Sequence, residues 1–246
     1  LADFYVTYLG MRELGRGPAG DVSLTDGFYN LSLLKRRAEL GEDAERPGLS
    51  HYGIEIEDIR EVEGQLEELA PSADIREENG DLHHGEYRVH DPNGLAVSLS
   101  TKGFGVSTNG RSLPCIRHIA LSVPKGDEVL DFYTGVFGFR EVTTSLKWRT
   151  APNPCYFAGD GGTNLAILPE PDRMRDTDRR FGLNHFGFLV PDMEQLLSRL
   201  PAEAGAAKRP PRPMAEQRAH DPDGNPFDLS RDLGYEVDYD RWERVE

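Results

Sequence analysis

The stretch RAHDPDG at residues 218–224 repeats the stretch RVHDPNG at residues 88–94. Arg, His, Asp, Pro and Gly recur at the same five places. Proline presets φ and glycine tolerates unusual φ values, so each copy predicts a tight turn between two strands. The chain therefore contains the same strand–turn–strand element twice, 130 residues apart.

The repetition extends outward from this turn over nearly the whole chain. The motif Leu-x-His-x-Gly occurs at residues 49–53 and 183–187, and Asn-Leu at 30–31 and 164–165. Asp-Phe-Tyr occurs at residues 3–5 and 131–133. Partners lie 128 to 134 residues apart and keep their order. Matched order at a near-constant offset indicates two copies of one domain.

Composition and charge restrict the possible functions. The chain has 246 residues, 37% of them hydrophobic, so each copy of roughly 120 residues can bury a core. With 43 acidic and 28 basic residues the net charge is −15, which disfavours nucleic acid and anionic membranes as partners. Two cysteines make no disulfide framework, so we expect a reducing, cytoplasmic location.

The second copy predicts a β-α-β-β-β unit followed by a second one. A β-branched strand at 115–123 precedes helical spacing at 127–137, which Gly138 ends. Three short strands follow, at about 140–144, 154–157 and 163–168. The second unit has a strand at 183–190, a helix at 193–200 and strands at 216–220 and 225–229.

The first copy follows the same plan, so the α+β chain contains four βαβββ units paired two by two. We assign residues 1–103 to an N-terminal domain, 114–232 to a C-terminal domain and 233–246 to an acidic tail, with a linker between the domains. The strand that opens the second copy has no counterpart in the first, because the repeat offset places it before Leu1. Targeting information would be lost with it.

This arrangement resembles the vicinal oxygen chelate superfamily, which includes glyoxalase I, extradiol dioxygenases and bleomycin resistance proteins. The residues that carry the resemblance are His118, His185 in Asn-His-Phe-Gly-Phe, and the hairpin at residues 221–229. The resemblance implies that each pair of units forms a half-open barrel of eight strands. It does not settle the function, because the superfamily includes many reactions.

The resemblance also implies metal ligands at His118, His185 and Asp228. Relatives with four ligands place a carboxylate where this chain has Ala166, which cannot bind metal. Two histidines and one carboxylate form a facial triad that suits Fe(II) and oxygen chemistry, with Mn(II) or Zn(II) as alternatives. Alternatively, each histidine is a hydrogen-bonded residue of the hydrophobic core and binds no metal.

Three further residues are candidates for binding the substrate. Arg218 stands where ring-cleaving relatives place a tyrosine, and it would hold an anionic group through its fork of donors. The alternative is that Arg218 is an ordinary strand residue paired with an acid, since Arg88 recurs at its place. Tyr156 and Trp148 would form an aromatic wall, although strand alternation allows only some of the aromatic residues to face the pocket.

The first copy serves as an internal control. Its places for the ligands hold His51 and Ser98, its counterpart of Ala166 is Ser32, and the place of His118 has no residue. We therefore predict a non-catalytic N-terminal domain that stabilises the other domain.

Three functions remain open at this point. The first is a dioxygenase-like metal enzyme acting on a small molecule chelated through neighbouring oxygens. The second is a glyoxalase-type lyase, isomerase or epimerase, which needs a base on the strand that contains Ala166. The third is a metal-free ligand-binding protein of the bleomycin resistance kind. The partner is a small molecule in each case, and the protein would be a monomer or a homo-oligomer.

Overall fold

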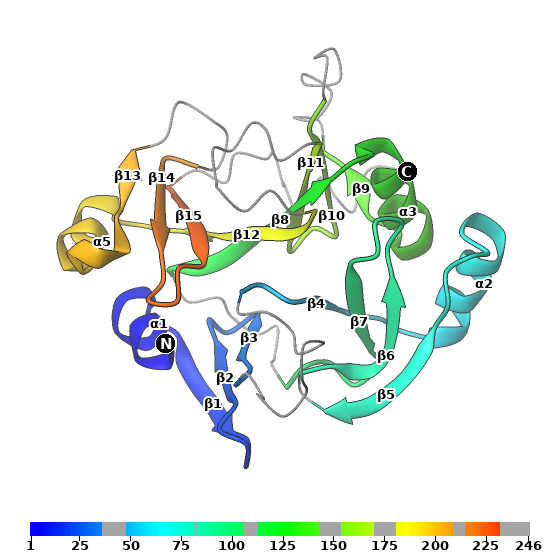
Figure 1. Ribbon diagram of the computed structural model, residues 1–246, viewed down its shortest axis with the longest axis horizontal. Coiled ribbons are helices and arrows are strands. Elements are labelled where there is room, and N and C mark those ends of the chain that lie inside the picture. Colours follow the sequence, from blue (N-terminus) through cyan, green and yellow to red (C-terminus); the bar gives the residue numbers. More distant parts are fainter. Residues whose placement is uncertain are drawn as a thin grey trace.

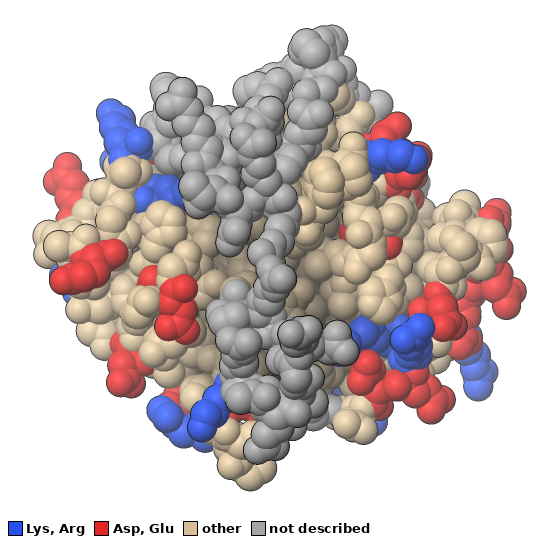
Figure 2. Space-filling model, viewed as in Figure 1, with Lys and Arg blue, Asp and Glu red and all other residues tan. Residues whose placement is uncertain are grey.

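A computed structural model describes residues 1–35, 48–81, 83–105, 113–142, 154–169, 181–208 and 215–231. Figure 1 shows the described elements in two halves, one above the other, with β8 and β12 crossing the middle of the upper half. No helix among these residues is both long and apolar enough to cross a membrane. Acidic and basic side chains are both spread around the rim of the face in Figure 2.

The C-terminal domain contains one sheet of eight strands. Its elements are β8 (Cys115–Val123), α3 (Gly126–Phe137), β9 (Arg140–Glu141), β10 (Tyr156–Gly159), β11 (Asn164–Pro169), β12 (Gly182–Leu189), α5 (Met193–Arg199), a 3-10 turn η3 (Ala202–Ala204), β13 (Ala207–Lys208), β14 (Gln217–His220) and β15 (Pro226–Ser230). The strand order is β13-β14-β15-β12-β8-β11-β10-β9. The two predicted units are therefore joined at their centre by β8 and β12, which pair antiparallel.

The N-terminal domain contains the same order of strands in two separate sheets. Its elements are α1 (Ala2–Leu9), β1 (Arg12–Arg16), β2 (Val22–Thr25), β3 (Asn30–Leu33), β4 (Tyr52–Glu55), α2 (Ile59–Leu69), β5 (Arg76–Asp81), β6 (Gly85–His90) and β7 (Ala96–Ser100). The sheets have the orders β1-β2-β3 and β4-β7-β6-β5. Among the described residues, nothing matches β8, which would join β3 to β4.

The local signals that form these elements recur with the domains. Helices α1 and α3 both end at a glycine in the left-handed conformation, Gly10 at φ 67° and Gly138 at φ 66°. A residue with a Cβ is strained in that conformation, so glycine ends the helix at little cost. Helices α2 and α5 both begin at an aspartate, Asp58 and Asp192, whose side chain accepts a backbone N–H of the first turn.

The two domains share both of their large hydrophobic cores. One core combines α2, β6 and β7 with β8, α3, β10 and β11. The other combines α1 and β2 with β12, α5 and β15. Each half of one domain therefore packs on a half of the other, and β8 and β12 meet the N-terminal domain with one face.

Two matching hydrogen bonds cross between the domains. The Tyr5 hydroxyl donates to Asp221 Oδ2 at 2.8 Å, and the Tyr133 hydroxyl donates to Asp91 Oδ2 at 3.3 Å. Both aspartates belong to the repeated turn, and their other oxygen accepts backbone N–H groups of that turn. Burial, followed by the charge of Asp221, raises the pKa of Tyr5, so the phenol keeps the proton that it donates.

Candidate metal centre

Three neighbouring strands bring His118, His185 and Asp228 together. In the sheet register, Gly187 of β12 lies opposite His118 of β8 on one side and opposite Asp228 of β15 on the other. His185 comes from β12 itself, two residues earlier. Their ligand atoms all lie within 4.8 Å of one another, the only such group of three or more among the described residues. The predicted triad is thus assembled in space.

Gly187 makes room for the His118 ring. A Cβ built on Gly187 would lie 1.9 Å from His118 Cε1, 2.4 Å from Nδ1 and 2.6 Å from Nε2. Any side chain at position 187 would therefore displace the imidazole. The sequence analysis did not assign this role to Gly187, although its recurrence as Gly53 was a signal for it.

Hydrogen bonds orient His185 toward Asp228. The Asn184 amide nitrogen donates to Ser122 Oγ at 3.2 Å, which leaves Asn184 Oδ1 to accept from His185 Nδ1 at 2.7 Å. With the proton on Nδ1, the lone pair of Nε2 faces Asp228 Oδ2 at 3.2 Å. Two acceptors repel at this distance unless His185 takes up a second proton or a cation lies between them.

The distance between these two atoms suits a shared metal ion. Protein nitrogen and oxygen ligands lie about 2.1 Å from a divalent ion, so two of them at right angles lie about 3.0 Å apart. His185 Nε2 and Asp228 Oδ2, at 3.2 Å, are close to this value. Asn184 supplies the outer hydrogen bond that metal-bound histidines usually make.

His118 has the properties of a neutral ligand. Its side chain is 2% exposed, and its Nδ1 has no hydrogen-bond partner among the described residues. Burial, and then the charge of His185, lowers its pKa well below the usual 6.5. A neutral imidazole with a free nitrogen can bind a metal ion without first losing a proton.

Arg218 binds Asp228 rather than facing an open pocket. Its Nε donates to Asp228 Oδ1 at 2.7 Å and its Nη2 to Oδ2 at 3.1 Å, and both side chains are buried. Burial alone would raise the pKa of Asp228. The charges of His185 and Arg218 and their hydrogen bonds to the carboxylate outweigh burial and hold this pKa well below its usual value. The alternative prediction, an arginine paired with an acid, therefore describes this residue, and direct substrate binding by Arg218 is not supported.

The wall beside the triad is apolar. Ala166 lies opposite Ala120 of β8 in the sheet register, and both pack with Val142 and Phe157 in a small buried cluster. His118 and Ala120 alternate onto the same face of β8. Ala166 therefore occupies the inner face, as predicted, and adds no ligand there.

The aromatic predictions have different outcomes. Tyr156 lies on the opposite face of β10 from Phe157, where its ring packs against Gly126 of α3. This position does not agree with a role for Tyr156 in the site, and Phe157 is the aromatic residue on the inner face. Strand alternation predicts that only one of Tyr156 and Phe157 points inward, but it does not say which one. Trp148 lies outside the described residues.

The N-terminal domain has the same frame without the triad. Gly53 of β4 lies opposite Ser98 of β7, as Gly187 lies opposite Asp228. A Cβ on Gly53 would lie 2.4 Å from the ring of Phe104, and the Phe104 carbonyl accepts a hydrogen bond from Asn30 at 2.7 Å. Phe104 thus occupies the place that His118 has in the other domain, so this copy has no counterpart of the His118 ligand.

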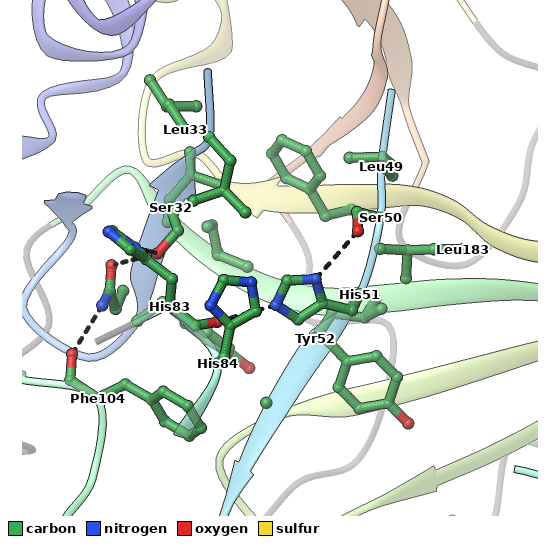
Figure 3. A pocket seen from close by; sticks show the side chains of 18 of the residues that line it. Ser32, Leu33, Leu49, Ser50, His51, Tyr52, His83, His84, Phe104 and Leu183 are labelled. Atoms are coloured by element: carbon green, nitrogen blue, oxygen red, sulfur yellow. Dashed lines mark hydrogen bonds between the residues drawn. The ribbon is translucent and has the colours of Figure 1, made fainter. Parts of the chain in front are cut away.

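A cavity of about 1540 Å³ is lined by residues of β3 and β4 in the N-terminal domain and of β8 and β12 in the C-terminal domain. Figure 3 shows His51 and His84 stacked side by side within it, below Leu33 and Leu49. His51 forms hydrogen bonds with the Ser50 hydroxyl through Nδ1 and with the backbone carbonyl of His83 through Nε2. His185 contributes to the cavity wall, whereas His118 and Asp228 do not, so the cavity is distinct from the interior of the triad.

The comparisons with known proteins agree with this arrangement. A model of the Glyoxalase/Bleomycin resistance protein/Dioxygenase superfamily matches residues 116–229. No curated protein sequence matches the chain. The 2,3-dioxygenase LapB from Pseudomonas sp. KL28 is similar in structure, with a TM-score of 0.61 and 20% identity over 92% of this chain and 85% of that one.

Two further solved structures extend the comparison. The Mn(II)-bound glyoxalase from Novosphingobium aromaticivorans has a TM-score of 0.64 and 19% identity, over 92% of this chain and 75% of that one. A variant of homoprotocatechuate 2,3-dioxygenase from B. fuscum has a TM-score of 0.65 and 16% identity, over 97% and 68%. Residues 116–229 thus match the model of the Glyoxalase/Bleomycin resistance protein/Dioxygenase superfamily, and the chain shares the α+β fold of these solved structures.

Proposed function

We propose that this chain is a metal-dependent enzyme of the dioxygenase-like kind, with His118, His185 and Asp228 as its metal ligands. The observation that carries the proposal is the convergence of two histidines and one carboxylate, all buried, within 4.8 Å. Fe(II) is the expected ion, because a facial triad of this composition suits non-haem iron, and Mn(II) or Zn(II) are alternatives. When bound, such an ion would supply a Lewis acid that can bind neighbouring oxygens of a substrate.

The chain's own residues have separate tasks in this proposal. Asn184 fixes the ring of His185, and Gly187 admits the ring of His118. Arg218 holds the carboxylate of Asp228 in place. The buried wall of Ala120, Ala166 and Phe157 keeps water away from the reacting group. No carboxylate stands at Ala166 to act as a base, so an isomerase or lyase reaction ranks lower.

A metal-free ligand-binding protein is the second candidate. It is favoured by the ion pair of Arg218 with Asp228, which compensates the buried carboxylate without any metal. This candidate would not need the open coordination positions, and His118 would be a core residue.

Metal analysis of the untagged protein, purified anaerobically, tests the first proposal. We expect about one Fe or Mn per chain in the wild type and none in Asp228→Ala. The double variant Asp228→Ala/Arg218→Met removes both buried charges, so it separates loss of metal from loss of folding. Ser98→Ala changes the matching position of the N-terminal domain and should keep the metal.

Reconstitution gives the outcome that would overturn the proposal. A wild-type protein that stays free of metal after incubation with Fe(II) or Mn(II) would make the histidines structural and favour the ligand-binding candidate. Turnover of a chelating substrate that continues under strict anaerobiosis would instead favour glyoxalase-type chemistry.

A further inference from the structure

Arg218 cancels the charge of the one carboxylate in the triad. The guanidinium and the carboxylate face each other through two hydrogen bonds, across the register pair Arg218–Asp228 of β14 and β15. Charge-assisted pairs with this geometry are strong and directional. The described ligand set therefore carries no net negative charge, whereas two histidines and an unpaired carboxylate would carry one.

In the N-terminal domain, which has no carboxylate at the position matching Asp228, the matching arginine has a different partner. Arg88 stands in the place of Arg218 and lies opposite Ser98, which has no charge. Arg88 instead forms an ion pair with Glu78 at 3.2 Å, and both side chains are partly exposed. The arginine at this repeated position thus forms a buried pair with two hydrogen bonds only in the domain that has a carboxylate opposite it.

We propose that this centre selects a doubly anionic chelating ligand, and that Arg218 is the residue that sets this preference. The inference rests on the metal-dependent function proposed above. The positive charge of Arg218 neutralises the negative charge of Asp228. A divalent ion and its three ligands, taken together with Arg218, would therefore have a net charge of two, as the ion has in water. The site is buried, however, and opposite charges attract more strongly there than in water. A ligand with two negative charges therefore gains more from the site than a ligand with one.

Oxalate and oxamate test the proposal, because they have nearly the same shape and chelating oxygens but differ by one charge. Their dissociation constants would be measured by calorimetry on the Zn(II)-loaded protein. We expect the wild type to prefer oxalate over oxamate by at least tenfold more than aqueous Zn(II) does. A preference no greater than that of the aqueous ion would overturn the proposal without any variant.

Variants assign the preference to Arg218. In Arg218→Gln the preference should fall at least tenfold, because Asp228 is then uncompensated. Arg218→Lys keeps the charge and should keep most of the preference. Arg88→Gln, at the matching place of the N-terminal domain, should behave as the wild type. An unchanged preference in folded Arg218→Gln would refute the role of Arg218.

The zinc content of each protein is measured first, so that the two proposals fail separately. A wild type that binds no zinc or other divalent ion contradicts the proposed function itself. A wild type that binds one ion per chain without preferring oxalate contradicts only the inference about charge.

Discussion

Replacing Gly187 by alanine should disable the metal centre through a single added methyl group. The new Cβ would lie 1.9 Å from His118 Cε1, whereas ordinary contacts begin at about 3.4 Å, so the ring must move by about 1.5 Å. Metal–ligand distances tolerate only about 0.2 Å. His118 would therefore leave the coordination sphere, and two ligands would remain.

The expected loss of metal affinity is larger than 100-fold. Removing an outer hydrogen bond to a metal ligand typically costs about 10- to 100-fold, and Gly187→Ala removes a ligand itself. The added volume in a packed interior should also lower the free energy of unfolding by about 1–3 kcal/mol. The affinity would be measured by competition with a zinc-sensitive chelating dye, and the stability by urea unfolding of the metal-free protein.

Gly53→Ala is the matched control. Its Cβ would lie 2.4 Å from the ring of Phe104 in the N-terminal domain, so it also overpacks an aromatic ring against a strand. We expect a similar loss of stability and an unchanged metal affinity. A folded Gly187→Ala protein that binds zinc as tightly as the wild type would refute the placement of His118 in the metal centre.

The remaining predictions concern stability. Asp228→Ala should lower the free energy of unfolding by about 3–5 kcal/mol, because the buried charge of Arg218 loses the carboxylate it pairs with. Urea unfolding measures this loss, and a value under about 1 kcal/mol would argue against a buried ion pair between the two residues. Tyr5→Phe should cost about 1–3 kcal/mol through the lost bond to Asp221, and a neutral result would mean that water replaces the hydroxyl. The pKa of His118 is lowered, so only the unfolded chain takes up its proton below pH 6.5. The metal-free wild type should therefore lose up to about 1.4 kcal/mol per pH unit relative to His118→Asn between pH 6.5 and 5, and parallel curves would contradict the lowered pKa.

The sequence predicted the parts of this molecule that depend on local patterns. The repeat predicted the equivalent strands, and the helical spacing predicted the helix end at Gly138. The family resemblance, carried by His118, His185 and the hairpin at residues 221–229, implied the three candidate ligands. These features depend on spacing along the chain, which the sequence displays directly.

Features that depend on contacts across the sheet were less accessible. The phase of alternation in β10 places Phe157 inward and Tyr156 outward, and only the pairing with β11 fixes it. The partner of Arg218 depends on the register of β14 with β15, which leaves substrate binding and an ion pair as equal readings of the sequence. The use of Phe104 in the place of His118 could not be foreseen, because the two residues are unrelated in the repeat.

The crossed hydrogen bonds from Tyr5 to Asp221 and from Tyr133 to Asp91 have a consequence for how the chain unfolds. Each domain completes the repeated turn of the other, and each of the two large cores contains strands and helices from both. A fragment limited to residues 116–229 would lose α1, α2 and half of both cores. We therefore expect one cooperative transition for the whole chain, and an excised C-terminal domain that aggregates.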